Sequence, residues 1–187
     1  MKWRVCTIFN FLFSFPDTIN FMNYFFAKNK VKEFQQESRN YDFKVMICDD
    51  ENIVLKAQKR LLETICKEHN KEVYIETASN GLECLYKIFD NYVNKGISYN
   101  ILLIDENMTV LNGTDAILLL RKLQSNKSIN NFLIFSVTGH EDEENINRIM
   151  SSGCDGTVAK PLSKHTFLSL LIKCNFISQE QVKLNKK

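Results

Sequence analysis

Residues 101–113 of the chain read ILLIDENMTVLNG, and this stretch decides the fold class. Its first four residues form an unbroken apolar run of strand length, which is typical of a central parallel strand covered on both faces. The run ends on Asp105, and the Asn112-Gly113 pair further on indicates a turn. We therefore predict a buried strand that carries an acidic residue to one edge of a sheet.

The alternation of strand and helix extends from this stretch in both directions. Short apolar runs predict the strands, and apolar residues at helical spacing predict the helices. The predicted strands are residues 43–48, 72–78, 101–104, 132–137 and 154–159, and the predicted helices are residues 52–68, 80–94, 114–124, 142–152 and 163–174. Because parallel strands need helical crossovers, this order predicts an α/β fold with a doubly wound, five-stranded parallel sheet.

Polar residues stand where the predicted strands end. Asp49 and Asp50 follow the first strand, and Asp105 follows the third. Thr138 ends the fourth strand and Lys160 the fifth. The carboxyl ends of the strands share one edge of such a sheet, and its active crevice lies there. The sequence therefore predicts that three carboxylates, a hydroxyl and an ammonium group converge.

These groups form a chemically coherent set. Clustered carboxylates repel one another and cannot all ionise cheaply without a cation. An incomplete set of oxygen ligands suits Mg²⁺, which keeps waters and shares ligands with a phosphate. A carboxylate is also a covalent phosphoryl acceptor, while lysine and threonine can stabilise phosphoryl oxygens. The set favours phosphoryl transfer, which needs mainly positioning and charge stabilisation.

The stretches that carry these residues are VMICDDE, ILLIDENMTVLNG, IFSVTGH and GCDGTVAKP, in this order. Over residues 43–173 the chain resembles the receiver domains of two-component response regulators and hybrid histidine kinases. The resemblance implies a flavodoxin-like receiver fold, an Mg²⁺ cofactor and a phosphorelay function. It also implies that a histidine kinase or histidine phosphotransfer protein is the phosphoryl donor, and that phosphorylation switches the binding of a downstream protein.

The resemblance assigns a role to each residue that takes part in phosphoryl transfer. Asp105 matches the phospho-acceptor, Thr138 the switch hydroxyl and Lys160 the lysine that contacts the phosphoryl group. Pro161 follows that lysine as in the family, where the peptide bond between them is usually cis. Gly113 matches the glycine of the turn after the acceptor strand.

The resemblance also implies a set of metal ligands. Asp50 matches the acidic residue that binds the metal directly, and Asp49 matches its neighbour, which acts through water. Asp105 supplies a further carboxylate, and Asn107 matches the position whose backbone carbonyl completes the set.

Two positions depart from the family pattern. Thr109 stands four residues after Asp105, where the family usually has proline, so we expect a looser loop. Thr157 stands three residues before Lys160, where an aromatic ring usually turns inward during switching. A small residue there predicts a weaker shift, confined to the loops after the third and fourth strands. It also leaves open a second hypothesis, a receiver-like interaction module that signals without phosphorylation.

Other enzyme classes are disfavoured by missing motifs. An aspartyl hydrolase of the haloacid dehalogenase kind needs Asp-x-Asp after its first strand, whereas Asp49 and Asp50 are adjacent. No GxGxxG follows the first strand, which argues against dinucleotide binding. Neither glycine motifs for ATP nor a histidine box occur, so we expect no kinase or other enzyme activity from the chain itself. Both a stand-alone receiver and a fragment of a hybrid kinase remain possible.

The flanking segments and the composition add the remaining expectations. The 187 residues, 44% of them hydrophobic and 25% charged, predict a globular domain with a real core. A net charge of +2 gives no argument for a nucleic-acid partner. Six cysteines without a CxxC pair indicate reduced thiols and a cytoplasmic protein. Residues 1–42 predict an N-terminal extension, either poorly ordered or a docking or surface helix, with a membrane span disfavoured, and residues 174–187 predict a short basic tail.

Overall fold

The computed structural model describes residues 41–140 and 142–184. Strands and helices alternate along them, as the sequence predicts, and the bounds differ from the predicted ones by a few residues at most. The strands are β1 (Lys44–Cys48), β2 (Tyr74–Ala78), β3 (Ile101–Asp105), β4 (Leu133–Thr138) and β5 (Gly156–Ala159), and the helices are α3 (Asn52–Glu68), α4 (Gly81–Lys95), α5 (Gly113–Ser125), α6 (Glu143–Ser151), α7 (Lys164–Lys173) and α8 (Gln179–Leu184).

The five strands form one parallel sheet in the order β2-β1-β3-β4-β5. β3 lies at its centre, and all of its residues are buried. β1 pairs with both β2 and β3. The chain therefore adds β2 on one side of β1 and then crosses over to add β3, β4 and β5 on the other side. The doubly wound parallel sheet of the sequence analysis is therefore confirmed, and the carboxyl ends of β1 and β3 lie side by side.

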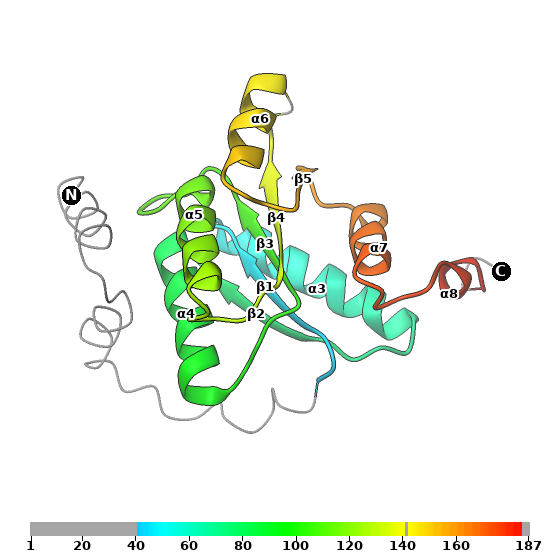
Figure 1. The fold of residues 1–187 in the computed structure, drawn as a ribbon. Helices are drawn as coiled ribbons and strands as arrows, with labels where there is room; N and C mark the ends of the chain where they lie inside the picture. The colour runs from blue at the N-terminus through cyan, green and yellow to red at the C-terminus, as the bar shows by residue number, and fades with distance from the viewer. Residues whose placement is uncertain (1–40, 141, 185–187) are drawn as a thin grey trace, which may run out of the picture. The chain divides into compact units, whose positions relative to one another are not determined.

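Helices cover both faces of the sheet (Figure 1). α3 packs with α7 on one face, α4 packs with α5 on the other, and α6 lies against β5. Side chains alternate along each strand, so Val45 and Ile47 enter the core beneath α3 and α7. Met46 and Cys48, which are also buried, point to the opposite face.

Four helices begin at a short polar side chain that accepts a backbone hydrogen bond from the third helical residue. These N-caps are Asn80, Asn112, Asp142 and Ser163. Each satisfies one of the N–H groups that a helix start leaves without an internal partner. α5 and α6 thus begin at fixed points close to the carboxyl ends of β3 and β4, where the candidate site lies.

The ordered chain continues beyond α7 into a segment that the sequence analysis assigned to a tail. Ile177 is buried in the core, and the ring of Phe176 stacks on that of Phe43, with ring centroids 4.2 Å apart. α8, which follows, had no counterpart in the sequence prediction. The prediction for the N-terminal extension falls almost wholly outside the described residues. Among the helices of residues 41–140 and 142–184, none combines the length and apolar character needed to cross a bilayer.

Candidate functional site

Three carboxylates meet at the carboxyl edge of the sheet. Asp49 and Asp50 follow β1, and Asp105 is the last residue of β3. The two strands pair in register, Cys48 opposite Ile104, so the residues that come next are neighbours. One oxygen from each carboxylate lies within 4.8 Å of the others. Asp49 and Asp105 are buried, whereas Asp50 is partly exposed, so the cluster opens to solvent on the Asp50 side.

Lys160 follows the edge strand β5, and its side chain reaches across to this cluster. Its Nζ lies 2.9 Å from Asp105 Oδ1 and 3.0 Å from Asp49 Oδ2. Its backbone N–H donates to the Thr138 carbonyl, and the Lys160–Pro161 peptide bond is cis, as the family resemblance implies. One ammonium group beside three carboxylates leaves an excess of negative charge at this edge.

The surroundings change the proton affinities of this ion pair. Burial raises the pKa of Asp105, and the Asp49 charge adds to the rise, although Lys160 and the Asn107 backbone N–H oppose it. Burial lowers the pKa of Lys160, but its hydrogen bonds and charge attraction to Asp105 and Asp49 outweigh this and leave it raised. The ammonium is thus well stabilised, while the ionised Asp105 carboxylate remains under electrostatic cost.

The residues present fit a hard divalent cation. All three candidate ligand groups are carboxylates, the uncompensated charge is negative, and burial raises the pKa of Asp105, so a nearby cation would favour its ionised form. Mg²⁺ prefers oxygen ligands and usually binds through one or two carboxylates plus water or phosphate. Asn107 is exposed beside Asp105, and the role of its carbonyl stays a prediction.

Thr109, one of the two departures from the family pattern, holds the loop to the site. Its backbone N–H donates to Asp50 Oδ2 at 3.1 Å. A proline at this position has no N–H to donate. The bond opposes the loosening that the sequence analysis expected here, because it tethers the loop after β3 to the end of β1.

Thr138, in contrast, makes no hydrogen bond to the carboxylates. Its Oγ1 donates to the His140 carbonyl at 3.3 Å and accepts from the His140 N–H at 3.1 Å and from Asn145 Nδ2 at 3.3 Å. The hydroxyl therefore faces the start of α6. Thr157, the second departure, lies partly buried in β5 opposite Ser136.

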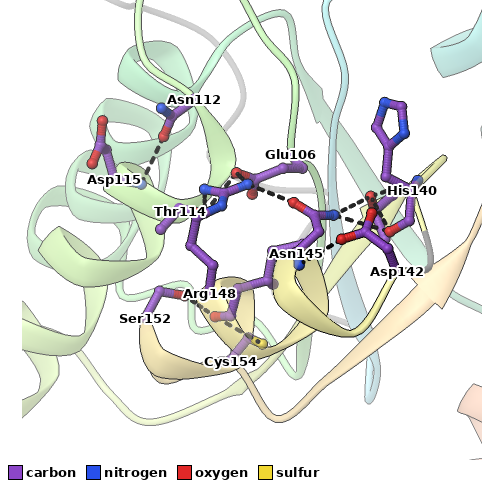
Figure 2. Close-up of polar contacts among 12 residues, drawn as sticks. Glu106, Asn112, Thr114, Asp115, His140, Asp142, Asn145, Arg148, Ser152 and Cys154 are labelled. Carbon is purple, nitrogen blue, oxygen red and sulfur yellow. Dashed lines mark hydrogen bonds and ion pairs between the residues drawn. The ribbon is translucent and has the colours of Figure 1, made fainter.

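A second polar cluster adjoins the site, and the sequence analysis did not identify it (Figure 2). Glu106 follows Asp105 directly and is 2% exposed. Its Oε1 accepts from Thr114 Oγ1 at 2.6 Å and lies 2.9 Å from the Arg148 guanidinium. The only signal in the sequence was a charged residue directly after the most apolar strand. Nothing in the spacing predicted that α6 would supply Arg148 as its partner.

Gly113 allows the chain after β3 to turn tightly into α5. A Cβ atom there would lie 2.5 Å from the Asp105 carbonyl oxygen and 2.9 Å from Glu106 Cα, both of which are backbone atoms. Gly113→Ala is therefore expected to destabilise the protein by about 1–3 kcal/mol in urea unfolding, since the backbone under the site must shift.

Gly139→Ala provides a matched control for this prediction. It lies at the same edge of the sheet, yet a Cβ there meets nothing within 4 Å. Its effect on the free energy of unfolding is expected to stay within about 0.5 kcal/mol. Equal losses in both variants would show that the close approach at Gly113 is not what requires glycine.

Comparisons with known proteins agree with this geometry. Residues 45–172 match the model of the response regulator receiver domain family. The chain is similar to hybrid signal transduction histidine kinase I of Dictyostelium discoideum, 24% identical over 140 residues, and to osmosensing histidine protein kinase SLN1 of Saccharomyces cerevisiae, 26% identical over 144 residues. These alignments cover 74% and 77% of this chain but only 8% and 11% of the relatives' lengths.

Solved structures share the fold. A CheY-like receiver domain protein from Methanospirillum hungatei is 25% identical, with a TM-score of 0.57 over 75% of this chain and 97% of its own. The receiver domain of Saccharomyces cerevisiae Ssk1, solved with the histidine phosphotransfer protein Ypd1, is 18% identical, with a TM-score of 0.57 over 73% of this chain and 93% of that one. With the family match extending from β1 into α7, the chain belongs to the response regulator receiver domain family.

Proposed function

We propose that this domain accepts a phosphoryl group from a phosphohistidine donor onto Asp105, with Mg²⁺ as cofactor, and thereby switches the binding of a partner protein. The observation that carries the proposal is the position of Asp105. Its carboxylate ends the central strand, pairs with Lys160 on one side and lies among the Asp49 and Asp50 carboxylates on the other. A nucleophile and the groups that would stabilise its product therefore occupy one small volume.

The proposed reaction is a transfer between two nucleophiles. A carboxylate oxygen of Asp105 forms a bond to phosphorus, and the bond between phosphorus and the donor's imidazole nitrogen breaks. The imidazole leaves with the electron pair, and the product on this chain is an acyl phosphate. Lys160 already contacts Asp105 Oδ1 and would pair with an oxygen of the arriving group. Positioning and charge stabilisation are the main needs of such a transfer.

Asp50, Asp105 and the Asn107 carbonyl would hold the metal, with Asp49 acting through water. The ion would supply positive charge for the carboxylates and the phosphoryl oxygens. Thr138 would respond to phosphorylation by donating a hydrogen bond to a phosphoryl oxygen, since its buried hydroxyl lies at the same edge of the sheet. Thr109 contributes by holding Asp50 toward the loop.

The donor class follows from the chemistry and is supported by the relatives. Two similar proteins are histidine kinases, and a structural neighbour was solved with a histidine phosphotransfer protein. We therefore propose a histidine kinase or a histidine phosphotransfer protein as the donor. In this proposal the described domain supplies the receiving step of the transfer.

Incubation with a small acyl phosphate and Mg²⁺, followed by intact mass measurement, tests the function. We expect the mass of one added phosphoryl group, lost on treatment with hydroxylamine, as acyl phosphates are. A chelator in place of Mg²⁺ should suppress the gain. Beryllofluoride with Mg²⁺ should also bind, because it mimics the acyl phosphate. If neither reagent modifies or binds the folded protein, the domain is an interaction module that works without phosphorylation.

A further inference from the structure

We propose that Asn145 and Arg148 of α6 are positioning residues for Thr138. Together they hold its hydroxyl toward α6 in the unphosphorylated domain. When the hydroxyl turns away from α6, the change is passed through Asn145 and Arg148 to Glu106 and to the start of α5. The inference rests on the proposed function, because it concerns how Thr138 responds to a phosphoryl group on Asp105. The contacts that carry it lie in one continuous chain of polar groups (Figure 2).

Asn145 bridges two groups at the end of β4. Its Nδ2 donates to Thr138 Oγ1 at 3.3 Å and to the His140 carbonyl at 2.9 Å. Its backbone N–H is held by the carboxylate of Asp142, the N-cap of α6. The amide is thus fixed at the helix start. From there it occupies an acceptor site of the Thr138 hydroxyl and also binds the carbonyl that accepts the hydroxyl's proton.

Arg148 determines which way the Asn145 amide faces. Its guanidinium donates to Asn145 Oδ1 at 2.8 Å. A guanidinium has only donors, so it must face the amide oxygen, and the amide nitrogen must then face Thr138. Without this contact the amide could turn, and its hold on Thr138 would weaken. Arg148 therefore acts on the threonine through Asn145.

Glu106 explains why Arg148 is held in place although half of it is exposed. The glutamate is 2% exposed and lies one residue after Asp105, whereas Arg148 is 50% exposed. A buried carboxylate strongly favours a partner with positive charge. The same guanidinium donates to Thr114 Oγ1 at 3.1 Å, and Thr114 in turn donates to Glu106. The chain of contacts thus ends on the first turn of α5 and on Glu106, the first residue of the loop after Asp105.

The His140 carbonyl and a phosphoryl oxygen on Asp105 would compete for the proton of the Thr138 hydroxyl. The hydroxyl has one proton, which now goes to the His140 carbonyl. Donation to a phosphoryl oxygen on Asp105 requires that the hydroxyl turn away from His140 and Asn145. A contact that is made only in the unphosphorylated state stabilises that state, and by linkage it lowers the affinity for a ligand that favours the phosphorylated state. The Asn145 contact therefore holds back switching. Its release frees an N–H of the Asn145 amide, whose oxygen Arg148 still holds, so the effect spreads to the α5–α6 side rather than toward Thr157.

The test measures the affinity of the full chain for beryllofluoride with Mg²⁺. Asn145→Ala removes the contact to Thr138 but keeps the backbone bond to Asp142. It is expected to tighten beryllofluoride binding by about 2–12-fold, the equivalent of one hydrogen bond. Arg148→Lys keeps a positive charge beside Glu106 but lacks the fork, and it is expected to tighten binding in the same range. Thermal unfolding confirms that each variant is folded.

A double variant separates positioning from a merely structural role. Because Arg148 acts through Asn145, Arg148→Lys should add nothing in the presence of Asn145→Ala. The matched control is Arg121→Lys, which alters another arginine–carboxylate pair, with Asp155, and should leave the affinity unchanged. In NMR spectra, beryllofluoride should shift the amides of Glu106 and Thr114 in the natural protein and do so less in Arg148→Lys.

The outcomes are distinguishable from those of the proposed function. If the natural protein does not bind beryllofluoride, the proposed function fails, and this inference fails with it. If the natural protein binds it but Asn145→Ala binds equally or more weakly, only this inference is overturned. Additive effects of the two substitutions would overturn the role of Arg148 as a residue that acts through Asn145.

Discussion

Replacing Asp105 by asparagine is expected to abolish acyl phosphate formation. The variant keeps the shape of the side chain but lacks the carboxylate oxygen that would bond to phosphorus. No mass gain should follow incubation with a small acyl phosphate and Mg²⁺, whereas the natural chain gains one phosphoryl group. The effect is complete rather than partial, because in the proposed function no other described carboxylate ends the central strand.

Asp115→Asn is the matched control for this substitution. Asp115 lies in the first turn of α5, on the same side of the sheet edge, but outside the carboxylate cluster. That variant should be phosphorylated as the natural protein is. If Asp105→Asn still acquires a hydroxylamine-sensitive phosphoryl group, another residue is the acceptor.

The same asparagine variant is expected to be more stable than the natural protein in the absence of metal. Burial and the Asp49 charge raise the pKa of Asp105, so the folded state bears a cost whenever this carboxylate is ionised. A neutral amide removes that cost, and Lys160 keeps its contact with Asp49. A higher midpoint of thermal unfolding in chelator, at neutral pH, would agree with this reasoning. A lower midpoint would show that the Lys160–Asp105 pair stabilises more than the cluster costs.

Asp50→Ala is expected to have the second-largest effect, on metal binding. Asp50 is the carboxylate of the cluster that is partly exposed, so it lies where an ion would enter. Even residues that only support metal ligands typically contribute 10–100-fold to affinity, so the loss of a direct ligand should weaken Mg²⁺ binding by about 100-fold or more. Titration with Mg²⁺, followed by calorimetry or by amide shifts near Asp105, measures it.

Asp42→Ala controls for the general loss of one negative charge. Asp42 is exposed and precedes β1, whereas the cluster follows it. Its Mg²⁺ titration should match that of the natural chain. If Asp50→Ala also gives the natural titration, the metal lies elsewhere and the assignment of Asp50 is wrong.

The position of the site residues at the carboxyl edge of the sheet was predictable, because each of them directly follows a recognisable apolar strand. Residues 101–104 are apolar without interruption, and the structure buries every one of them in the central strand. Asp105 had to follow at the sheet edge, and strand order brought Asp49 and Asp50 beside it. The meeting of Lys160 with these carboxylates was predicted in the same way, since parallel strands all present their carboxyl ends together.

The polar network beside the site was not predictable, because its partners come from different elements. Glu106 was recognisable only as a charged residue after a strand, and Arg148 only as a polar position of a helix. Their meeting depends on where α6 places Arg148 relative to the start of α5, which no local spacing encodes. The Thr109 contact was missed for another reason: a family comparison marks the absent proline, but the N–H that replaces it shows its effect only in three dimensions.

The C-terminal packing was also beyond the sequence rules. The segment after α7 is short and mostly polar, and its apolar residues have no period that predicts burial. Ile177 nevertheless enters the core, and the prediction that the domain ends at residue 173 does not account for this contact.

The stack of Phe176 on Phe43 has a topological consequence. The residue directly before β1 and the segment that follows α7 touch each other, so the chain enters the sheet and leaves α7 at neighbouring points. A polypeptide carrying the domain between two others would receive both neighbours at one edge, with the carboxylate cluster at the opposite ends of the strands. Such a domain can be inserted into another protein, or removed from it, with little separation of the two points where the flanking chain is joined.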